Sequence, residues 1–382
     1  MALATPRPVA TRPPEEGARQ RGEVVRAVLL PFFLHRALLV GAATFLSQFI
    51  PQSHLFHTGS IRLFDMWFRW DAIHYLRIAA YGYGEGSESF FPLYPLLSAL
   101  VGQVVGLHIG ALLISNLLAL CALYLLHGWV RERYGAAVAA RAVIVYLLFP
   151  TSFFLSAPYA ESTYLACCVG VFCSAQRRPA LAFMLVFAAC LARPQGFVCT
   201  TIPFGLAWLI QSRRIGAFPW FTLACFPALL ALLAVHRGYT GDPWGFLHAE
   251  GVQNLRAFWD GQAPAPAWWE VLWDDGMGQN LMRRLLNWSA LGFAAVGSAW
   301  LIRERAAEEV SVVVLTFALP LFLQGGLFDA ASMARYAILA FPLLVLLARW
   351  TTGNNAARYV DWGLGMLQVV LFSLFTSSLW AE

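Results

Sequence analysis

The sequence predicts an all-α integral membrane protein that crosses the lipid bilayer many times. Its 382 residues are 59% hydrophobic and only 12% charged, whereas about 25% of the residues in an ordinary soluble domain are charged. A membrane-spanning helix takes about 20 apolar residues, so the chain has room for about eleven spans. This composition excludes a soluble globular protein. The chain contains no basic run with interleaved aromatic residues, so nucleic acid is not an expected partner.

The chain begins with a polar segment, residues 1–23, whose Pro, Arg and Glu content predicts a disordered tail. The apolar run that follows is too long for the core of a signal peptide and lacks a clear cleavage site, so we expect an uncleaved first span at 27–50. By the positive-inside rule, the arginines around its start place the N-terminus in the cytoplasm. These arginines are Arg7, Arg12, Arg19, Arg21 and Arg26.

The next apolar stretch is predicted to lie in the membrane interface or to re-enter rather than to cross. Residues 93–106 would form a helix of about 21 Å, against a hydrocarbon core of about 30 Å. If residues 90–107 were instead a full span, Arg131, Arg177 and Arg213 would all lie on the outer face, against the positive-inside rule. We therefore expect the arginine clusters after it to be cytoplasmic turns.

These choices define one membrane domain, residues 24–382, with about eleven spans and an outer C-terminus. Two outer loops, 51–92 and 238–283, are expected to carry the active-site face and interfacial helices. The predicted spans are 27–50, 108–130, 137–154, 159–176, 179–193, 196–211, 216–236, 284–302, 310–326, 336–348 and 362–380.

The sequence gives little sign of a metal or disulfide site. All seven cysteines fall inside apolar stretches, which is typical of small core or lipid-facing residues. Ligand-like His spacing, a Gly-rich phosphate loop and a Ser nucleophile elbow are missing from the sequence. We therefore expect no cofactor and no metal.

The segment from Phe64 to Ala79 is the most informative one. A helix here places Asp71, His74 and Tyr75 on one face, because residues three and four apart are neighbours on a helix. A carboxylate beside the low-dielectric membrane surface can serve as a general base. Asp65, six residues earlier, is the runner-up base. The structural alternative is that Asp71 only pairs with a neighbouring arginine, either Arg69 or Arg77.

Three later elements place charges at the ends of predicted spans. Glu161 enters an apolar span, which is costly unless it pairs with an arginine or lines a wet cavity that holds substrate. Arg193 and the pair Arg335-Tyr336 stand at outer helix junctions. Guanidinium groups there could bind the oxygens of a phosphate leaving group, or they could simply neutralise Glu161 or Asp71.

Together these residues resemble a known family, the PIG-V-like mannosyltransferases of the GT-C glycosyltransferase superfamily. The resemblance covers nearly the whole chain after residue 25, and its first two segments are the more specific ones. One departure is Pro194-Gln195, where the family more often has Ser-Asn. The matching segments are Arg69-Trp70-Asp71-Ala72-Ile73-His74-Tyr75, Phe90-Phe91-Pro92-Leu93-Tyr94-Pro95, Pro158-Tyr159-Ala160-Glu161-Ser162, Arg193-x-x-Gly196, Gly241-Asp242-Pro243 and Arg335-Tyr336.

The resemblance implies a metal-independent, inverting transfer of mannose from polyprenyl-phosphate-mannose on the extracytoplasmic face. Eukaryotic members use dolichol-phosphate-mannose to build the glycosylphosphatidylinositol anchor. The Lys-free, Ala-rich composition is typical of a high-GC bacterium, so the expected location is a bacterial cytoplasmic membrane and the expected acceptor is an unidentified lipid-, glycan- or protein-linked group.

On this reading Asp71 is the base, His74 contacts the acceptor or the phosphate, and Arg193 or Arg335 stabilises the phosphate. Glu161 is expected to bind sugar or acceptor hydroxyls, and Tyr75 and Tyr336 complete the site. Two alternatives stay open. One is a transporter or lipid flippase, and the other is a related transferase that uses another polyprenyl-linked sugar.

Overall fold

The computed structural model describes residues 22–46, 48, 66–84, 87–211, 217–248, 277–323 and 332–376. Within these ranges the regular structure is entirely helical, with no strand, as the sequence predicts. The helices are α2 (Leu30–Leu46), α4 (Asp71–Tyr81), α5 (Leu93–Val105), α6 (Leu107–Tyr134), α7 (Ala136–Leu148), α8 (Glu161–Ser174), α9 (Pro179–Ala192), α10 (Gln195–Cys199), α11 (Ile202–Gln211), α12 (Cys225–Thr240), α13 (Gly245–His248), α16 (Met277–Arg303), α17 (Ala307–Leu323), α18 (Met333–Tyr336), α19 (Phe341–Thr351) and α20 (Ala356–Thr376), with the short helices η1 (Val25–Leu29), η3 (Ser152–Leu155) and η5 (Trp220–Ala224).

Five of the described helical stretches are long and apolar enough to cross a membrane, which indicates an integral membrane protein. The prediction of about eleven spans is not confirmed, because the other apolar helices are 10–17 residues long. The five long stretches are Gly22–Leu46, Leu107–Tyr134, Trp220–Thr240, Arg284–Arg303 and Ala356–Thr376.

Several shorter apolar helices lie inside the bundle rather than along its surface. Nearly every residue of α8 is buried, between α6 and α9, and a buried helix needs no full membrane length of its own. The predicted span 137–154 ends early, at Leu148 of α7, and η3 follows it. The predicted span 196–211 is divided into α10 and α11. Apolar composition alone could not separate such internal helices from true spans.

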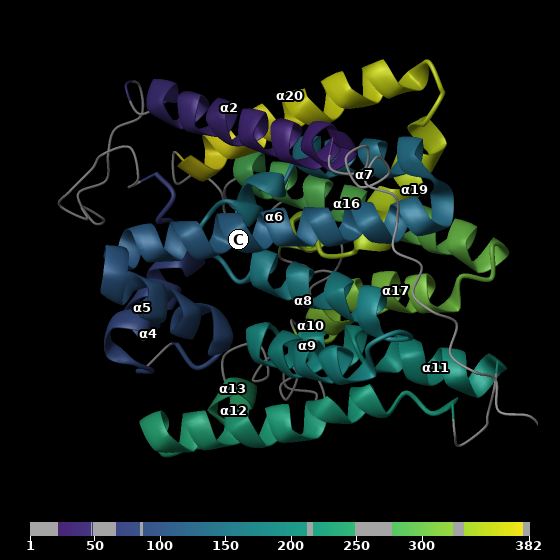
Figure 1. Cartoon of the computed structure of the whole chain (residues 1–382). Helices are drawn as coiled ribbons and strands as arrows, with labels where there is room; N and C mark the ends of the chain where they lie inside the picture. The colour runs from purple at the N-terminus through teal and green to yellow at the C-terminus, as the bar shows by residue number, and fades with distance from the viewer. Residues whose placement is uncertain are drawn as a thin grey trace, which may run out of the picture.

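The expected short helix at 93–106 is present as α5, and it does not continue into α6. Gly106 separates the two helices with φ +86°, a backbone conformation that favours glycine. The chain therefore reverses, and α5 packs back along the first turns of α6. Figure 1 shows α4 and α5 together beside one end of α6. That end of the bundle carries the candidate site.

The hydrophobic core lies where α6, α7, α8, α9 and α19 meet. Edge-to-face contacts join Trp129 to Phe172 and Phe341, with ring centroids 6.2 and 5.5 Å apart. In Figure 1, α2 and α20 lie along one side of the bundle and α12 lies along the opposite side. The short helices that lie between these two sides can therefore end within the bundle. Their polar ends can then face a cavity.

We expect Gly110→Ala to destabilise the protein, because a Cβ at this position would lie 2.7 Å from the backbone nitrogen of Gly102. Moving α5 away from α6 would cost about 1–3 kcal/mol, as for other overpacked contacts. The melting temperature of the purified protein in detergent measures this. Gly205→Ala in α11 is the control, because a Cβ there meets nothing within 4 Å. Equal melting temperatures for the two variants would contradict the close packing of α5 on α6.

Candidate active site

Asp71 is the first residue of α4, and the backbone before it is strained. Trp70 has φ +51° and ψ −123°, a conformation that costs a non-glycine residue about 1–3 kcal/mol. The turn is held by Tyr159, whose hydroxyl donates a hydrogen bond to the carbonyl oxygen of Arg69 at 2.9 Å. The carboxylate of Asp71 is thus presented at a helix N-terminus, where the helix dipole favours a negative charge.

Arg335 reaches Asp71 from a distant part of the chain. It belongs to the short helix α18, which follows Ser332 in the left-handed conformation with φ +59°. Its Nη1 lies 2.7 Å from Oδ2 of Asp71. The guanidinium also lies over the rings of Tyr159 and Phe154, 4.5 and 5.1 Å from their centroids. These cation–π contacts fix the plane of the guanidinium.

Glu161 joins Arg335 to a second arginine. It is the first residue of α8 and is fully buried. Its Oε1 accepts hydrogen bonds from Nη1 of Arg193 at 2.6 Å and from Nε of Arg335. Arg193 lies in extended backbone between α9 and α10, and its Nε donates to Oε1 of Gln195 at 3.3 Å. The result is a chain of alternating charges, Asp71–Arg335–Glu161–Arg193, whose formal charges cancel.

A cavity of about 320 Å³ opens onto this chain of charges. Asp71, Arg193 and Arg335 all line it, and the side chain of Asp71 is 19% exposed. Glu161 is not among the lining residues, so it acts behind the two arginines. The remaining lining residues are Tyr75, Ser89, Phe90, Phe91, Ala192, Pro194, Gln195, Pro320, Ser332 and Tyr336.

Tyr75 supplies a neutral hydroxyl at the cavity. Burial raises the pKa of Tyr75 well above its ordinary value of 10.0, so the phenol stays protonated at neutral pH. Because a protonated phenol can donate a hydrogen bond but is not a base, the partly exposed carboxylate of Asp71 is the better candidate for proton removal.

The structure brings together most of the site residues that the sequence suggested. Tyr75 and Tyr336 line the cavity with Asp71 and the two arginines. His74 does not line it, and its ring stacks on Phe90 at 4.7 Å. Asp65 lies outside the described residues.

The sequence left open that Glu161 and Asp71 pair with arginines instead of binding substrate, and both pairings occur in the structure. Glu161 pairs with both Arg193 and Arg335, and Asp71 pairs with Arg335 on a distant helix. Among the described residues, no cluster of three His, Cys, Asp or Glu side chains could hold a metal ion.

The sequence reasoning missed the aromatic platform of Phe154 and Tyr159 beneath Arg335. Both belong to the aromatic, proline-containing stretch before Glu161, and only the fold brings their rings under the guanidinium. Gln195 departs from the family pattern, and its side-chain oxygen accepts a hydrogen bond from Nε of Arg193.

We expect Glu161→Gln to be strongly destabilising, because the two guanidinium groups would lose the buried negative charge between them. Breaking a buried ion pair costs about 3–5 kcal/mol. Arg177→Gln is the control, since it removes a pair with Glu132 whose side chains are 74% and 58% exposed, and such pairs contribute at most about 1 kcal/mol. Thermal unfolding in detergent compares the two. If both variants lowered the melting temperature equally, the buried charge of Glu161 would contribute no more to stability than an exposed ion pair does.

No protein-family model matches the sequence, and a search of curated proteins found no match. Among solved structures, the chain is similar to the oligosaccharyltransferase of Archaeoglobus fulgidus, crystallised in complex with zinc and sulfate. The TM-score is 0.47 and the sequence identity is 13%, over 89% of this chain and 52% of the other. The present chain therefore spans about half the length of that structure.

Proposed function

We propose that the protein is an inverting glycosyltransferase of the GT-C type that transfers mannose from polyprenyl-phosphate-mannose to an acceptor hydroxyl on the extracytoplasmic face of a bacterial cytoplasmic membrane. One observation carries the proposal. A cavity in a membrane-embedded helical bundle is lined by a carboxylate, Asp71, and by two arginines that a buried glutamate holds in place. The family resemblance of the same segments supports the choice of sugar and donor.

This set of groups suits displacement at an anomeric carbon. The acceptor oxygen forms a new bond to that carbon while the bond to the phosphate oxygen breaks, and the phosphate leaves with the bonding electron pair. Asp71 takes the proton of the acceptor hydroxyl as general base. Arg335 and Arg193 donate hydrogen bonds to the phosphate, where negative charge develops. No metal is needed for the charge, since two guanidinium groups face the cavity.

Glu161 is proposed to position the arginines rather than to bind sugar. It is fully buried, and its Oε1 already accepts from both guanidinium groups. Because a phosphate is a competing anion, the donor would draw Arg335 away from Asp71 while Glu161 keeps the guanidinium near the cavity. The carboxylate of Asp71 would then be available to the acceptor. The contacts of Glu161 with the two arginines thus keep these groups in place for the reaction.

The apolar wall of the cavity suits a lipid-linked donor. Phe91 lines the cavity and makes ring contacts with Phe197 at 6.4 Å and with Phe246 at 6.2 Å. His74 stacks on Phe90, another lining residue, so it is proposed to hold this wall rather than to touch the phosphate. The first isoprene units of the donor would pack on these rings, with the remaining chain in the membrane.

We expect Asp71→Asn to lower the rate of mannose transfer by at least about 100-fold, because general-base catalysis contributes about that much. The assay uses the full chain in nanodiscs, labelled polyprenyl-phosphate-mannose, and membranes of cells that lack the protein as the acceptor source. Arg77→Gln is the control, since it removes an exposed charge from α4 outside the cavity. Full activity of Asp71→Asn, or loss of activity only in Asp65→Asn, would reject Asp71 as the base.

The sugar and the donor class are tested by a panel of donors given to the unaltered protein. We expect transfer from polyprenyl-phosphate-mannose, and little from the corresponding glucose or arabinose lipids or from GDP-mannose. Glucose differs from mannose in the orientation of its C2 hydroxyl and arabinose lacks the sixth carbon, so each would leave a hydrogen-bonding group of the pocket without its partner. GDP-mannose lacks the lipid chain that is proposed to pack on the aromatic wall. Mass spectrometry of the product identifies the sugar. Transfer of another sugar would correct the donor, and lipid translocation in proteoliposomes without any transfer would contradict an enzyme.

A further inference from the structure

A second cavity, of about 340 Å³, lies at the other end of α6 from the Asp71 site. α6 has 28 residues, and a helix of that length is about 42 Å long. The site helices α4 and α5 pack beside its first turns, whereas this cavity is lined by residues from Tyr124 to Arg133 in its last three turns. The cavity therefore belongs to the opposite face of the membrane and lies outside the proposed reaction.

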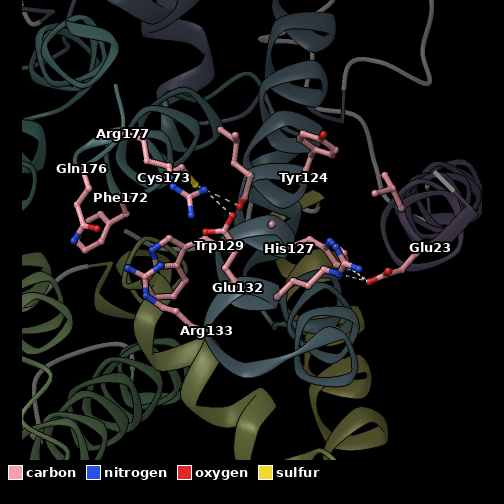
Figure 2. Close-up of a pocket in the computed structure, with 14 residues that line it drawn as sticks. Glu23, Tyr124, His127, Trp129, Glu132, Arg133, Phe172, Cys173, Gln176 and Arg177 are labelled. Atoms are coloured by element: carbon pink, nitrogen blue, oxygen red, sulfur yellow. Dashed lines mark hydrogen bonds and ion pairs between the residues drawn. The ribbon is translucent and has the colours of Figure 1, made fainter. Parts of the chain in front are cut away.

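Gly128 is a lining residue of this cavity, and a Cβ built there would meet nothing within 4 Å. Figure 2 shows Glu23 on one side of the cavity and Arg177 on the other. One helical turn before Gly128 the lining includes Tyr124 and Leu125, and one turn after it the lining includes charged groups. The cavity is thus apolar toward the bilayer centre and charged toward the membrane surface.

The charged half carries an excess of positive charge. Arg131 pairs with Glu23 at 2.9 Å, and Arg177 pairs with Glu132 at 3.0 Å. Arg133 lies over the ring of Trp129, with its guanidinium carbon 4.0 Å from the ring centroid. In the part of the chain that the structure describes, Arg133 has no carboxylate at ion-pair distance. Its donors are held flat by the indole and remain available to an anion.

Buried donors beside this arginine add to the same imbalance. Trp129 is 3% exposed, and its indole N–H finds no acceptor among the described residues. His127 is equally buried, and its Nε2 lies 3.8 Å from Glu23. Buried polar groups in native proteins are normally hydrogen-bonded. Within the described ranges, Arg133 has only a longer-range interaction with a carboxylate, that of Glu308, and an unmet donor lies next to it. These two observations favour an acceptor-rich, negatively charged group in this cavity.

We propose that this cavity binds one phospholipid with a net negative headgroup. The phosphate lies beside Arg133, on the side of α6 that carries Glu132 and Arg177, and one acyl chain follows the apolar half along Tyr124 and Leu125. A basic pocket between membrane helices suits anionic headgroups. The arginines are already partly neutralised by Glu23 and Glu132, so the site is complementary to a single net negative charge, such as that of phosphatidylglycerol, rather than to a polyanion. Inorganic phosphate shares the headgroup chemistry but lacks the acyl chain.

The proposal is tested by the melting temperature and by native mass spectrometry of the full chain in detergent, with phosphatidylglycerol, phosphatidylcholine or inorganic phosphate added. We expect one phosphatidylglycerol to be retained and to raise the melting temperature, while the other two have little effect. Arg133→Gln should weaken phosphatidylglycerol binding by about tenfold, the equivalent of one charge-assisted hydrogen-bonded pair.

A pair of glycine variants separates occupancy of the cavity from general lipid contact. Gly128→Leu fills the cavity and should abolish the retained lipid. Gly41→Leu in α2 should retain it, because a Cβ there also meets nothing within 4 Å but lies outside the cavity. The lipid-free melting temperatures of both variants report whether they fold, and Arg133→Gln provides the readout if Gly128→Leu does not.

Three results would overturn the proposal. Equal retention of phosphatidylglycerol by the Gly128→Leu and Gly41→Leu variants would show that the lipid does not bind in this cavity. Equal stabilisation by phosphatidylcholine would show that binding does not require a net negative headgroup. Equal stabilisation by inorganic phosphate would leave an anion site without a lipid. None of these results depends on sugar transfer, so a failure of this proposal would not affect the proposed reaction, and a failure of that reaction would not affect this proposal.

Discussion

The buried contact of Glu161 with Arg193 and Arg335 is the constraint on which the candidate site depends. These residues come from α8, from the junction of α9 and α10, and from α18, so a single carboxylate joins three separate parts of the bundle. Burying three charges is costly unless they satisfy one another. The helices that carry them must therefore end at the same place, and this explains why several of the apolar helices are too short to cross a membrane.

The same requirement accounts for the strained backbone around the site. Trp70 and Ser332 are two of the three described non-glycine residues with positive φ, and each lies next to or near a charged member of the chain, Asp71 and Arg335. Such conformations persist only when the surrounding structure fixes them. Here the fixing contacts are the hydrogen bond from Tyr159 to the backbone of Arg69 and the ion pair of Arg335 with Asp71.

The sequence allowed prediction of the helical membrane class, the short helix before α6 and five of the thirteen residues that line the cavity. Periodicity placed Asp71 and Tyr75 on one face, and both residues line the cavity. The number of spans was not predictable, because a helix buried among other helices is as apolar as one that faces lipid. The ion pair of Asp71 with Arg335 was also not predictable, because the two residues are 264 positions apart and only the fold brings them together. The sequence placed His74 beside Asp71, but not the stacking on Phe90 that turns its ring to the cavity wall.

The cancellation of charge along Asp71, Arg335, Glu161 and Arg193 has a consequence for how proton and phosphate movements are coupled. In the proposed reaction the leaving phosphate changes from a singly charged diester to a group with two negative charges, inside a cavity where an uncompensated charge is expensive. The proton that Asp71 accepts neutralises its carboxylate at the same moment. Because one negative charge is gained by the phosphate and one is lost by Asp71, the total charge within the cavity is the same before and after transfer. Arg335, already drawn to the phosphate, meets a stronger anion there. Proton removal on one side of the sugar thereby compensates the negative charge that develops on the other side.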